Sequence, residues 1–219
     1  MEKLIEKLQS EEKAFLSSKC LVLNNIVIQP KEIEAYYYKE GEFEDKSVHR
    51  NELQQNNKEH FYVHRNGLKK ESSYKGGNRS GVDFVVSDED NVYYSYLIRS
   101  AVVNGELVVG PHKVLEAIKK HCHFNSYDEI ENKQIKVKDQ QQSCAVLFSE
   151  RINLSTGFVD CELRAILCDE YYKESTYRGK EAIIVDYLLK EVKKGLSAEQ
   201  AREEVKKYLT YVPSKIKQL

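Results

Sequence analysis

The first 40 residues of the chain combine one helical pattern with two apolar, β-branched runs. Residues 1–18 place their apolar side chains on one stripe and predict an amphipathic helix. Residues 20–28 contain the run LVLNNIVI ahead of Pro30, and they predict a strand. Residues 31–38 are expected to be extended as well. The chain therefore begins with a helix followed by sheet.

Further strands are expected wherever short apolar runs lie between turn-forming residues. These are Phe61–His64, Asp83–Val86, Val92–Val103, 144–149 and 158–168. The polar segment 39–59 is expected to be a loop or a short helix, and 124–143 a surface excursion. The segment 65–81, RNGLKKESSYKGGNRSG, is a loop rich in glycine and basic residues.

Two later helices are predicted from their first residues. Gly110-Pro111 precedes HKVLEAIKKHC, and proline is favoured at the first position of a helix. Ser197 and Gln200 have the spacing of a capping box, which predicts a helix from Ser197 to Leu209. The apolar segment Ile183–Leu189 is compatible with a strand or with the beginning of a helix.

Length, composition and charge narrow the class of protein. The 219 residues fit one domain, and 41% hydrophobic residues suffice for a core. No apolar stretch approaches the roughly 20 residues of a membrane span, and the acidic N-terminal segment is unlike a signal peptide. Five cysteines without paired spacing indicate a reducing interior, so we expect a cytoplasmic protein. A net charge of −1 argues against strong non-specific DNA binding.

Candidate chemistry begins at Glu34-Ala35-Tyr36, which follows the first apolar run and precedes His49. A carboxylate, aromatic rings and a histidine are what a purine pocket needs, because rings stack on a base and a carboxylate can activate water. Alternation along a strand puts Tyr36 and Tyr38 on one face. The alternatives are a solvated glutamate at a strand end and a tyrosine in the core.

Other charged residues have both functional and structural interpretations. Arg99 lies in the apolar run YSYLIRSAVV and needs a partner, either Glu34, a phosphate or a purely structural acid. The basic loop could follow a nucleic-acid backbone or remain a solvated surface; its cations are Arg65, Lys69, Lys70, Lys75 and Arg79. His121-Cys122-His123 lacks a second ligand pair, so no metal site and no cofactor are expected.

The order of short motifs over residues 13–118 resembles the alkyladenine (methylpurine) DNA glycosylases, which excise damaged purines from duplex DNA. The matching segments are KAFLSSKCLVLN, EIEAYYY, EDKSVHRN, FYVH, LIRS and GPHKVLEAI, with a weaker similarity at YRGKEAIIV. The resemblance implies an α+β fold: a curved, mostly antiparallel sheet flanked by helices. We expect such a domain over 1–190, with a C-terminal helical tail, 191–219, packed on it.

The resemblance also implies roles for individual residues. Glu34 would activate the hydrolytic water, and Arg99 would lie near it to position water or phosphate. Tyr36, His49 and His64 would hold the flipped base. Asp83 falls near a pocket position that is asparagine in the family. Excision would be metal-free, and a monomer is expected to suffice.

Two departures from the family keep other functions open. Gly67 stands where the family inserts an aromatic wedge into duplex DNA, and only Leu68 or Tyr74 from the loop could replace it. His64 replaces a tyrosine wall. The leading prediction is a base-excision glycosylase acting on duplex or single-stranded DNA. The alternatives are a binding module for a purine nucleotide or modified base without catalysis, and an enzyme acting on a free nucleoside or single strand.

Overall fold

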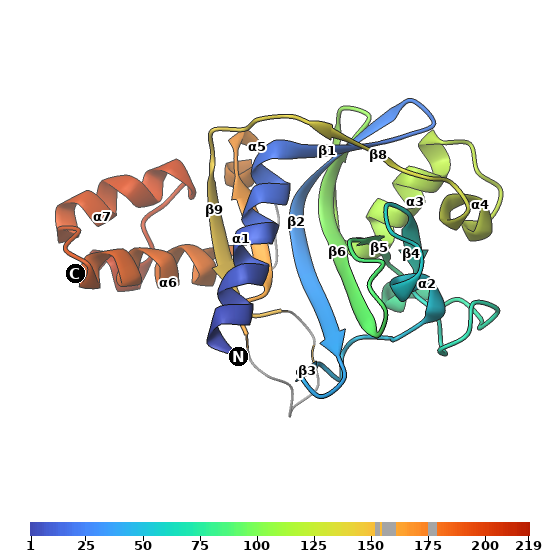
Figure 1. The fold of residues 1–219 in the computed structure, drawn as a ribbon. Coiled ribbons are helices and arrows are strands. Elements are labelled where there is room, and N and C mark those ends of the chain that lie inside the picture. Colours follow the sequence, from blue (N-terminus) through green and yellow to red (C-terminus); the bar gives the residue numbers. More distant parts are fainter. Residues whose placement is uncertain (152–153, 155–160, 175–178) are drawn as a thin grey trace.

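A curled antiparallel sheet of ten strands forms the centre of the α+β domain seen in a computed structural model, which describes residues 1–151, 154, 161–174 and 179–219 (Figure 1). The strands are β1 (Lys19–Leu23), β2 (Ile26–Lys39), β3 (Phe43–Glu44), β4 (Phe61–Val63), β5 (Val82–Val85), β6 (Val92–Val103), β7 (Glu106–Val109), β8 (Lys136–Asp139), β9 (Ala145–Ser149) and β10 (Arg164–Cys168). The main path is β4-β5-β6-β2-β1-β8, and β10 joins β2 to β9.

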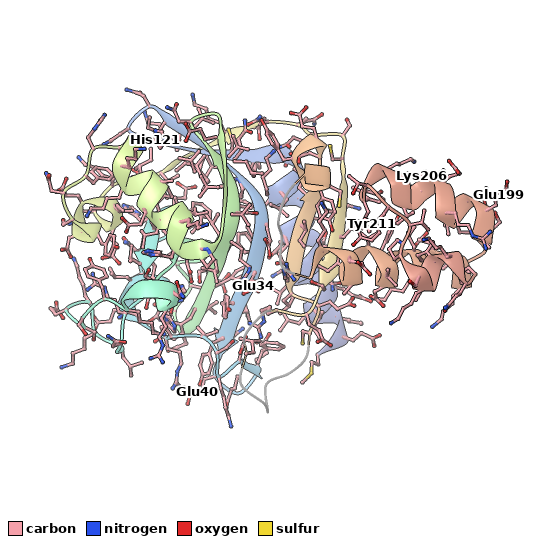
Figure 2. All side chains as sticks on the ribbon, turned by 180° about the vertical axis from the view of Figure 1, so that it is seen from behind. Glu34, Glu40, His121, Glu199, Lys206 and Tyr211 are labelled. Carbon is pink, nitrogen blue, oxygen red and sulfur yellow. The ribbon has the colours of Figure 1, made fainter. Side chains whose placement is uncertain are left out.

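Helices cover the sheet and extend it at one end. They are α1 (Glu2–Ser18), α2 (Glu52–Gln55), α3 (Pro111–His121), α4 (Tyr127–Glu131), α5 (Glu170–Glu174), α6 (Lys180–Lys193), α7 (Ala198–Glu204) and α8 (Ser214–Lys217). Figures 1 and 2 show α1 and α3 on opposite sides of the central strands. No helix in the described part of the chain has the length and apolarity to cross a bilayer.

The prediction of one strand over 20–28 is wrong, because this segment is a hairpin. Leu23 pairs with Ile26, and the two residues between them, Asn24 and Asn25, have φ of 47° and 68°. Asparagine tolerates this left-handed region, and two such residues make the tight turn that suits a hairpin. The apolar pattern on both sides of the turn concealed it.

Strand β2 is the longest in the sheet, and its two faces differ in burial. Pro30 lies inside it, at a register irregularity against β6, where a missing N–H is tolerated. Ile33, Ala35 and Tyr37 belong to the main apolar core together with side chains of α1, whereas Tyr36 and Tyr38 are only partly buried. The alternation predicted for the tyrosines is therefore confirmed.

The segment 124–143 is not simply a surface excursion. It contains α4 and the edge strand β8, which pairs with β1, and its apolar residues Ile130 and Ile135 are buried. Because the segment 124–143 is polar as a whole, its sequence pattern did not indicate that these two isoleucines would be buried. The strand expected over 158–168 is observed from Arg164 to Cys168, and residues 158–160 lie outside the described residues.

The C-terminal helices share a second apolar cluster. Ile183–Leu189 lies within the helix α6, and Leu188 packs with Leu147 and Ile166 from β9 and β10. The predicted capping box at Ser197 is confirmed: its hydroxyl accepts from the Gln200 N–H at 3.1 Å. The predicted division at residue 190 falls inside α6, and Figure 1 shows α6 and α7 beyond β9.

Candidate functional site

The predicted pocket residues gather on one face of the strands β2, β6 and β5. In the β2–β6 register Glu34 is opposite Leu97 and Tyr36 is opposite Ser95. In the β5–β6 register Asp83 is opposite Leu97 from the other side. Residues directly opposite in a ladder share a face. The sheet thus brings Glu34 and Asp83, which are 49 positions apart in the chain, to the two sides of Leu97.

Glu34 is fully buried and both of its carboxylate oxygens have partners. Oε1 forms an ion pair with Arg99 Nη1 at 3.2 Å, and Oε2 accepts a hydrogen bond from the Tyr36 hydroxyl at 3.0 Å. Figure 2 shows Glu34 near the middle of the sheet. Arg99 is thus placed beside Glu34, as the resemblance implied, and its charge compensates a buried carboxylate.

The ion pair extends into a chain of alternating charges. Arg99 Nε also donates to Glu32 Oε1 at 3.2 Å, and Arg164 Nε donates to the same oxygen at 2.7 Å. Burial alone would lower the pKa of Arg99, but attraction to Glu34 and Glu32 raises it above its usual range. Arg99 therefore stays charged, and the network keeps its guanidinium in one orientation.

Tyr36 has a cation on its ring. The guanidinium carbon of Arg151 lies 4.8 Å from the ring centroid, within cation–π range. Arg151 is itself held by Asp45 at 2.5 Å and by the Ala35 carbonyl at 3.2 Å. Burial, and then repulsion from Glu34, raise the pKa of Tyr36 well above its usual range, so its hydroxyl remains a proton donor.

Asp83 and His64 form a second close pair on this face. His64 Nε2 lies 2.7 Å from Asp83 Oδ1, while Oδ2 accepts from Ser95 Oγ at 2.9 Å and from Gln54 Nε2 at 3.3 Å. Burial opposes ionisation of Asp83, but attraction to His64 and the hydrogen bonds outweigh it and lower its pKa. Asp83 is therefore an anion that fixes one edge of the His64 ring.

His49 lies edge-on to His64, with ring centroids 4.7 Å apart. Its Nδ1 contacts the Tyr62 hydroxyl at 2.9 Å, and its Nε2 contacts Lys75 Nζ at 2.6 Å. An ammonium can only donate, so Nε2 accepts and the proton of neutral His49 is on Nδ1. Burial and repulsion from His64 lower the pKa of His49 to about 4.

Gly81 allows His64 to lie where it does. A Cβ at this position would be 3.1 Å from His64 Cε1 and 3.1 Å from Leu97 Cδ1. The Gly81 carbonyl also accepts from the His64 N–H at 3.1 Å. This close approach requires glycine, and the sequence offered no sign of it.

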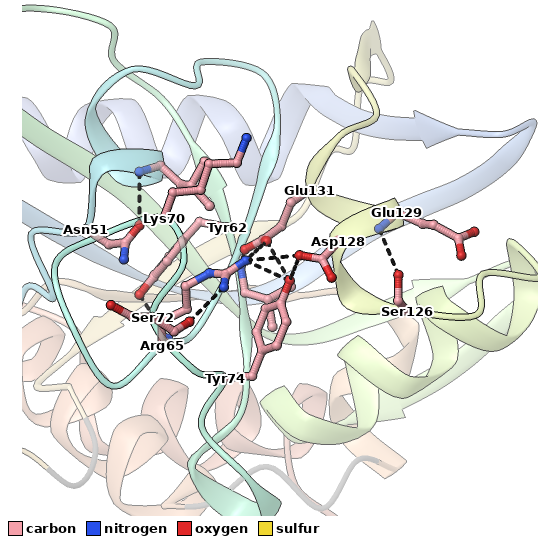
Figure 3. A network of polar contacts seen from close by, with 12 residues as sticks. Asn51, Tyr62, Arg65, Lys70, Ser72, Tyr74, Ser126, Asp128, Glu129 and Glu131 are labelled. Atoms are coloured by element: carbon pink, nitrogen blue, oxygen red, sulfur yellow. Dashed lines mark hydrogen bonds and ion pairs between the residues drawn. The ribbon is translucent and has the colours of Figure 1, made fainter.

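The basic loop divides into a buried and an exposed part. Arg65 is 5% exposed and forms an ion pair with Glu131, while Tyr74 donates to Glu131 at 2.8 Å (Figure 3). The prediction that Arg65 contacts a nucleic-acid backbone is therefore wrong. Arg65 is buried, and its charge needs the partner that Glu131 provides. Lys69, Lys70 and Arg79 are exposed.

Lys75 lies apart from these exposed cations, because its amine is directed to His49. Burial lowers the pKa of Lys75, with attraction to Asp83 acting in the opposite direction. The structure therefore places Lys75, half-buried, against His49 rather than leaving it on the solvated part of the loop.

Gly67, the position that the resemblance compares with the wedge, lies close to Ser72. A Cβ on Gly67 would be 2.6 Å from Ser72 Oγ, so a larger residue here would require the Ser72 side chain to move. The Tyr74 ring packs on Arg65 and Tyr127, and its hydroxyl is bonded to Glu131. Leu68, by contrast, is 57% exposed.

Four further residues of the face were missed by sequence reasoning. Arg164 lies in the apolar run RAILC and carries the same signal as Arg99. Ser95 lies between Tyr94 and Tyr96 of the apolar face of β6, so its side chain is on the other face. It could have been assigned to the site only once its register opposite Tyr36 was known. Arg151 and Gln54 lie in polar segments, and nothing in their surroundings marks them.

Metal chemistry and known relatives add nothing to this description. In the part of the chain that the structure describes, no three histidine, cysteine, aspartate or glutamate side chains gather as a metal site would require. No protein-family model matches the chain, and no curated protein matches it.

Proposed function

We propose that this protein binds a purine base over Leu97 and hydrolyses its N-glycosidic bond, as a divergent glycosylase of the alkyladenine type acting on DNA. The observation that carries the proposal is the convergence of Glu34, Tyr36, His49, His64 and Asp83 on one face of the sheet. The motif order along residues 13–118 supports the same family. The substrate would be an alkylated or deaminated purine.

Each group has a physical task in this reaction. Breaking the bond leaves positive charge on the sugar, which the Glu34 carboxylate stabilises while it takes a proton from water. Tyr36 and the two histidines supply ring faces and edges for the base. Asp83 fixes the orientation of the His64 ring through its contact with Nε2, which leaves Nδ1 for a contact with the base, and Arg99 holds Glu34 in place.

The exposed cations of the loop support a nucleic-acid substrate. Lys69, Lys70 and Arg79 are solvent-exposed, and the same loop contributes Lys75 to the pocket. A phosphate backbone that passes over the loop would therefore pass close to the base site. Binding through such contacts weakens as salt is raised.

One observation favours the second candidate, a binding module without excision. Glu34 is fully buried, and its two oxygens are already occupied by Arg99 and Tyr36. An attacking water would have to displace one of these partners. A protein that only binds the base has no such requirement.

Single-turnover base release decides between the two. Wild type, Glu34→Gln and the control Glu42→Gln, which changes an exposed acid, are incubated with duplex and single-stranded oligonucleotides containing hypoxanthine, ethenoadenine or 3-methyladenine. We expect release by wild type and Glu42→Gln and none by Glu34→Gln. Binding of the same oligonucleotides without release by the folded wild type would replace the enzyme with the binding module.

A further inference from the structure

A second cavity opens on the same face of the sheet, beyond the candidate base site. It has a volume of about 200 Å³ and is lined by Tyr38, Glu40, Arg50, Leu68, Asn91 and Tyr93. Figure 2 shows Glu40 at one end of the sheet and Glu34 near its middle. Pockets for drug-sized ligands measure about 300–1,000 Å³, so this cavity suits a smaller, single ring system.

The register sets the distance between the two places. Tyr38 is opposite Tyr93 and Glu34 is opposite Leu97, so the cavity begins two side-chain repeats beyond the proposed base site on both strands. Four residues of a strand span about 14 Å. This separation is larger than the spacing of stacked bases, so two adjacent bases would reach both places only when they are unstacked and turned apart.

The lining has the chemistry that recognises a nucleobase. The Tyr38 and Tyr93 rings both line the cavity and pack edge to face, with centroids 6.0 Å apart and an angle of 71° between their planes. The guanidinium of Arg50 lies 4.9 Å from the Tyr38 centroid and donates to its hydroxyl at 3.4 Å. Tyrosine faces and arginine planes are the groups on which unpaired bases stack.

The remaining residues complete such a site. Leu68 is 57% exposed and contributes an apolar surface to the lining of the cavity. Glu40 and Asn91 are exposed at the rim and offer acceptors and donors to a base edge. Arg50 is exposed as well and can meet a phosphate.

We propose that this cavity binds the unpaired base adjacent to the purine held over Leu97, so that the protein acts on single-stranded DNA or on a locally opened duplex. This inference rests on the proposed function for the identity of its ligand. A base that is paired and stacked in a duplex has both faces covered and cannot enter. Glycine at position 67, where the resembled family has its wedge, agrees with a substrate that needs none.

Binding to undamaged DNA tests the cavity without requiring catalysis. Fluorescence anisotropy is measured with a short labelled single-stranded oligonucleotide and with its duplex. The proteins are wild type, Tyr93→Ala, Leu68→Ser and Tyr211→Ala. Tyr211 is a 52% exposed tyrosine beside the C-terminal helices (Figure 2) and serves as the matched control. Leu68→Ser changes an exposed loop residue, so a folding defect cannot explain its effect.

We expect wild type to prefer the single strand. Tyr93→Ala and Leu68→Ser should each weaken that binding, Tyr93→Ala about tenfold, as removal of one stacked base does. Tyr211→Ala should bind like wild type. Equal affinity of wild type for duplex and single strand, or equal affinities of all four proteins for the single strand, would overturn the inference.

A second experiment locates the base. A tetrahydrofuran residue, which lacks a base, replaces the nucleotide on one or the other side of the damaged purine in a single strand. Loss of the base on one side should weaken binding by wild type and have no further effect on Tyr93→Ala. Additive losses would show that the cavity does not hold that base.

The two proposals can fail separately. Base release that depends on Glu34 but is indifferent to Tyr93 and Leu68 would keep the glycosylase and remove the second site. Single-strand binding that depends on Tyr93, without release of any base, would keep the second site and remove the glycosylase.

Discussion

Glu34 and Asp83 face each other across Leu97, because each is directly opposite that residue in its own strand register. Two inter-strand spacings separate their backbones by about 10 Å. Glu34 is compensated by Arg99 and Asp83 by His64, so the two buried carboxylates have different partners. Leu97 thus lies as an apolar residue between two anchored anions, and the geometry around it leads to testable consequences.

Replacing Gly81 by alanine should move His64. The new Cβ would lie 3.1 Å from both His64 and Leu97, so the imidazole must shift and strain its bond to Asp83. We expect a loss of about 1–3 kcal/mol in stability, as for other overpacked sites, and weaker oligonucleotide binding. Thermal unfolding and anisotropy measure both.

Gly76→Ala is the matched control, since nothing lies within 4 Å of a Cβ at that position. It should unfold and bind like wild type. If Gly81→Ala did the same, the pocket would tolerate a displaced His64.

His49 should titrate far below an ordinary histidine. Burial and repulsion from His64 lower its pKa from 6.5 to about 4. Between these values the unfolded chain binds a proton that the folded protein does not, so stability is complete above pH 6.5 and falls as pH drops towards 4. The loss amounts to at most about 3 kcal/mol.

NMR titration of the His49 ring measures this pKa directly, and urea unfolding at several pH values measures the linkage. His49→Gln should flatten the stability curve over this pH range. A His49 pKa near 6.5 would mean that the contacts with Tyr62 and Lys75 do not persist in solution.

Removing one partner of the Arg65–Glu131 pair should be costly. Arg65→Met leaves Glu131 buried without its cation, a change that costs about 3–5 kcal/mol in comparable pairs. Lys69→Met, on the exposed part of the same loop, should change stability by less than about 0.5 kcal/mol. Urea unfolding compares the two.

DNA binding should distinguish Lys69 from Arg65 in the opposite way, because here the exposed Lys69 is the residue whose replacement matters. Lys69→Met should reduce the salt dependence of binding, because it removes a phosphate contact. An Arg65→Met protein that is as stable as wild type and loses salt dependence would return Arg65 to the nucleic-acid surface.

Glu12 should keep its proton at pH values at which the glutamates of the unfolded chain have lost theirs. Its Oε1 accepts from the Ala35 N–H at 3.1 Å, and burial raises its pKa well above 4.5. Above pH 4.5 the unfolded chain releases a proton that the folded protein keeps, so stability falls as pH rises through the folded-state pKa. Glu12→Gln should remove this decline and be more stable than wild type at alkaline pH. Urea unfolding across pH tests it, and an unchanged pH profile would refute it.

Local patterns were sufficient for much of the fold. Apolar stripes and alternation identify α1, β5, β6 and most of β2, and the Gly110-Pro111 and Ser197 signals mark where α3 and α7 begin. They failed at Asn24-Asn25, where a turn of two residues is embedded in an apolar run. They also failed over 124–143, where two buried isoleucines, Ile130 and Ile135, hold a polar segment in place.

The sequence by itself determined which residue types were present for chemistry: a glutamate and a tyrosine two positions apart, two histidines, and an arginine in an apolar strand. Only the tertiary structure decided which of them meet, because contact between strands depends on register and not on separation along the chain. The strand register places both Glu34 and Asp83 opposite Leu97, and the pairing of β10 with β2 brings Arg164 to Glu32. The burial of Arg65 beside Glu131 likewise depends on α4, whose position no local pattern around residue 65 could reveal.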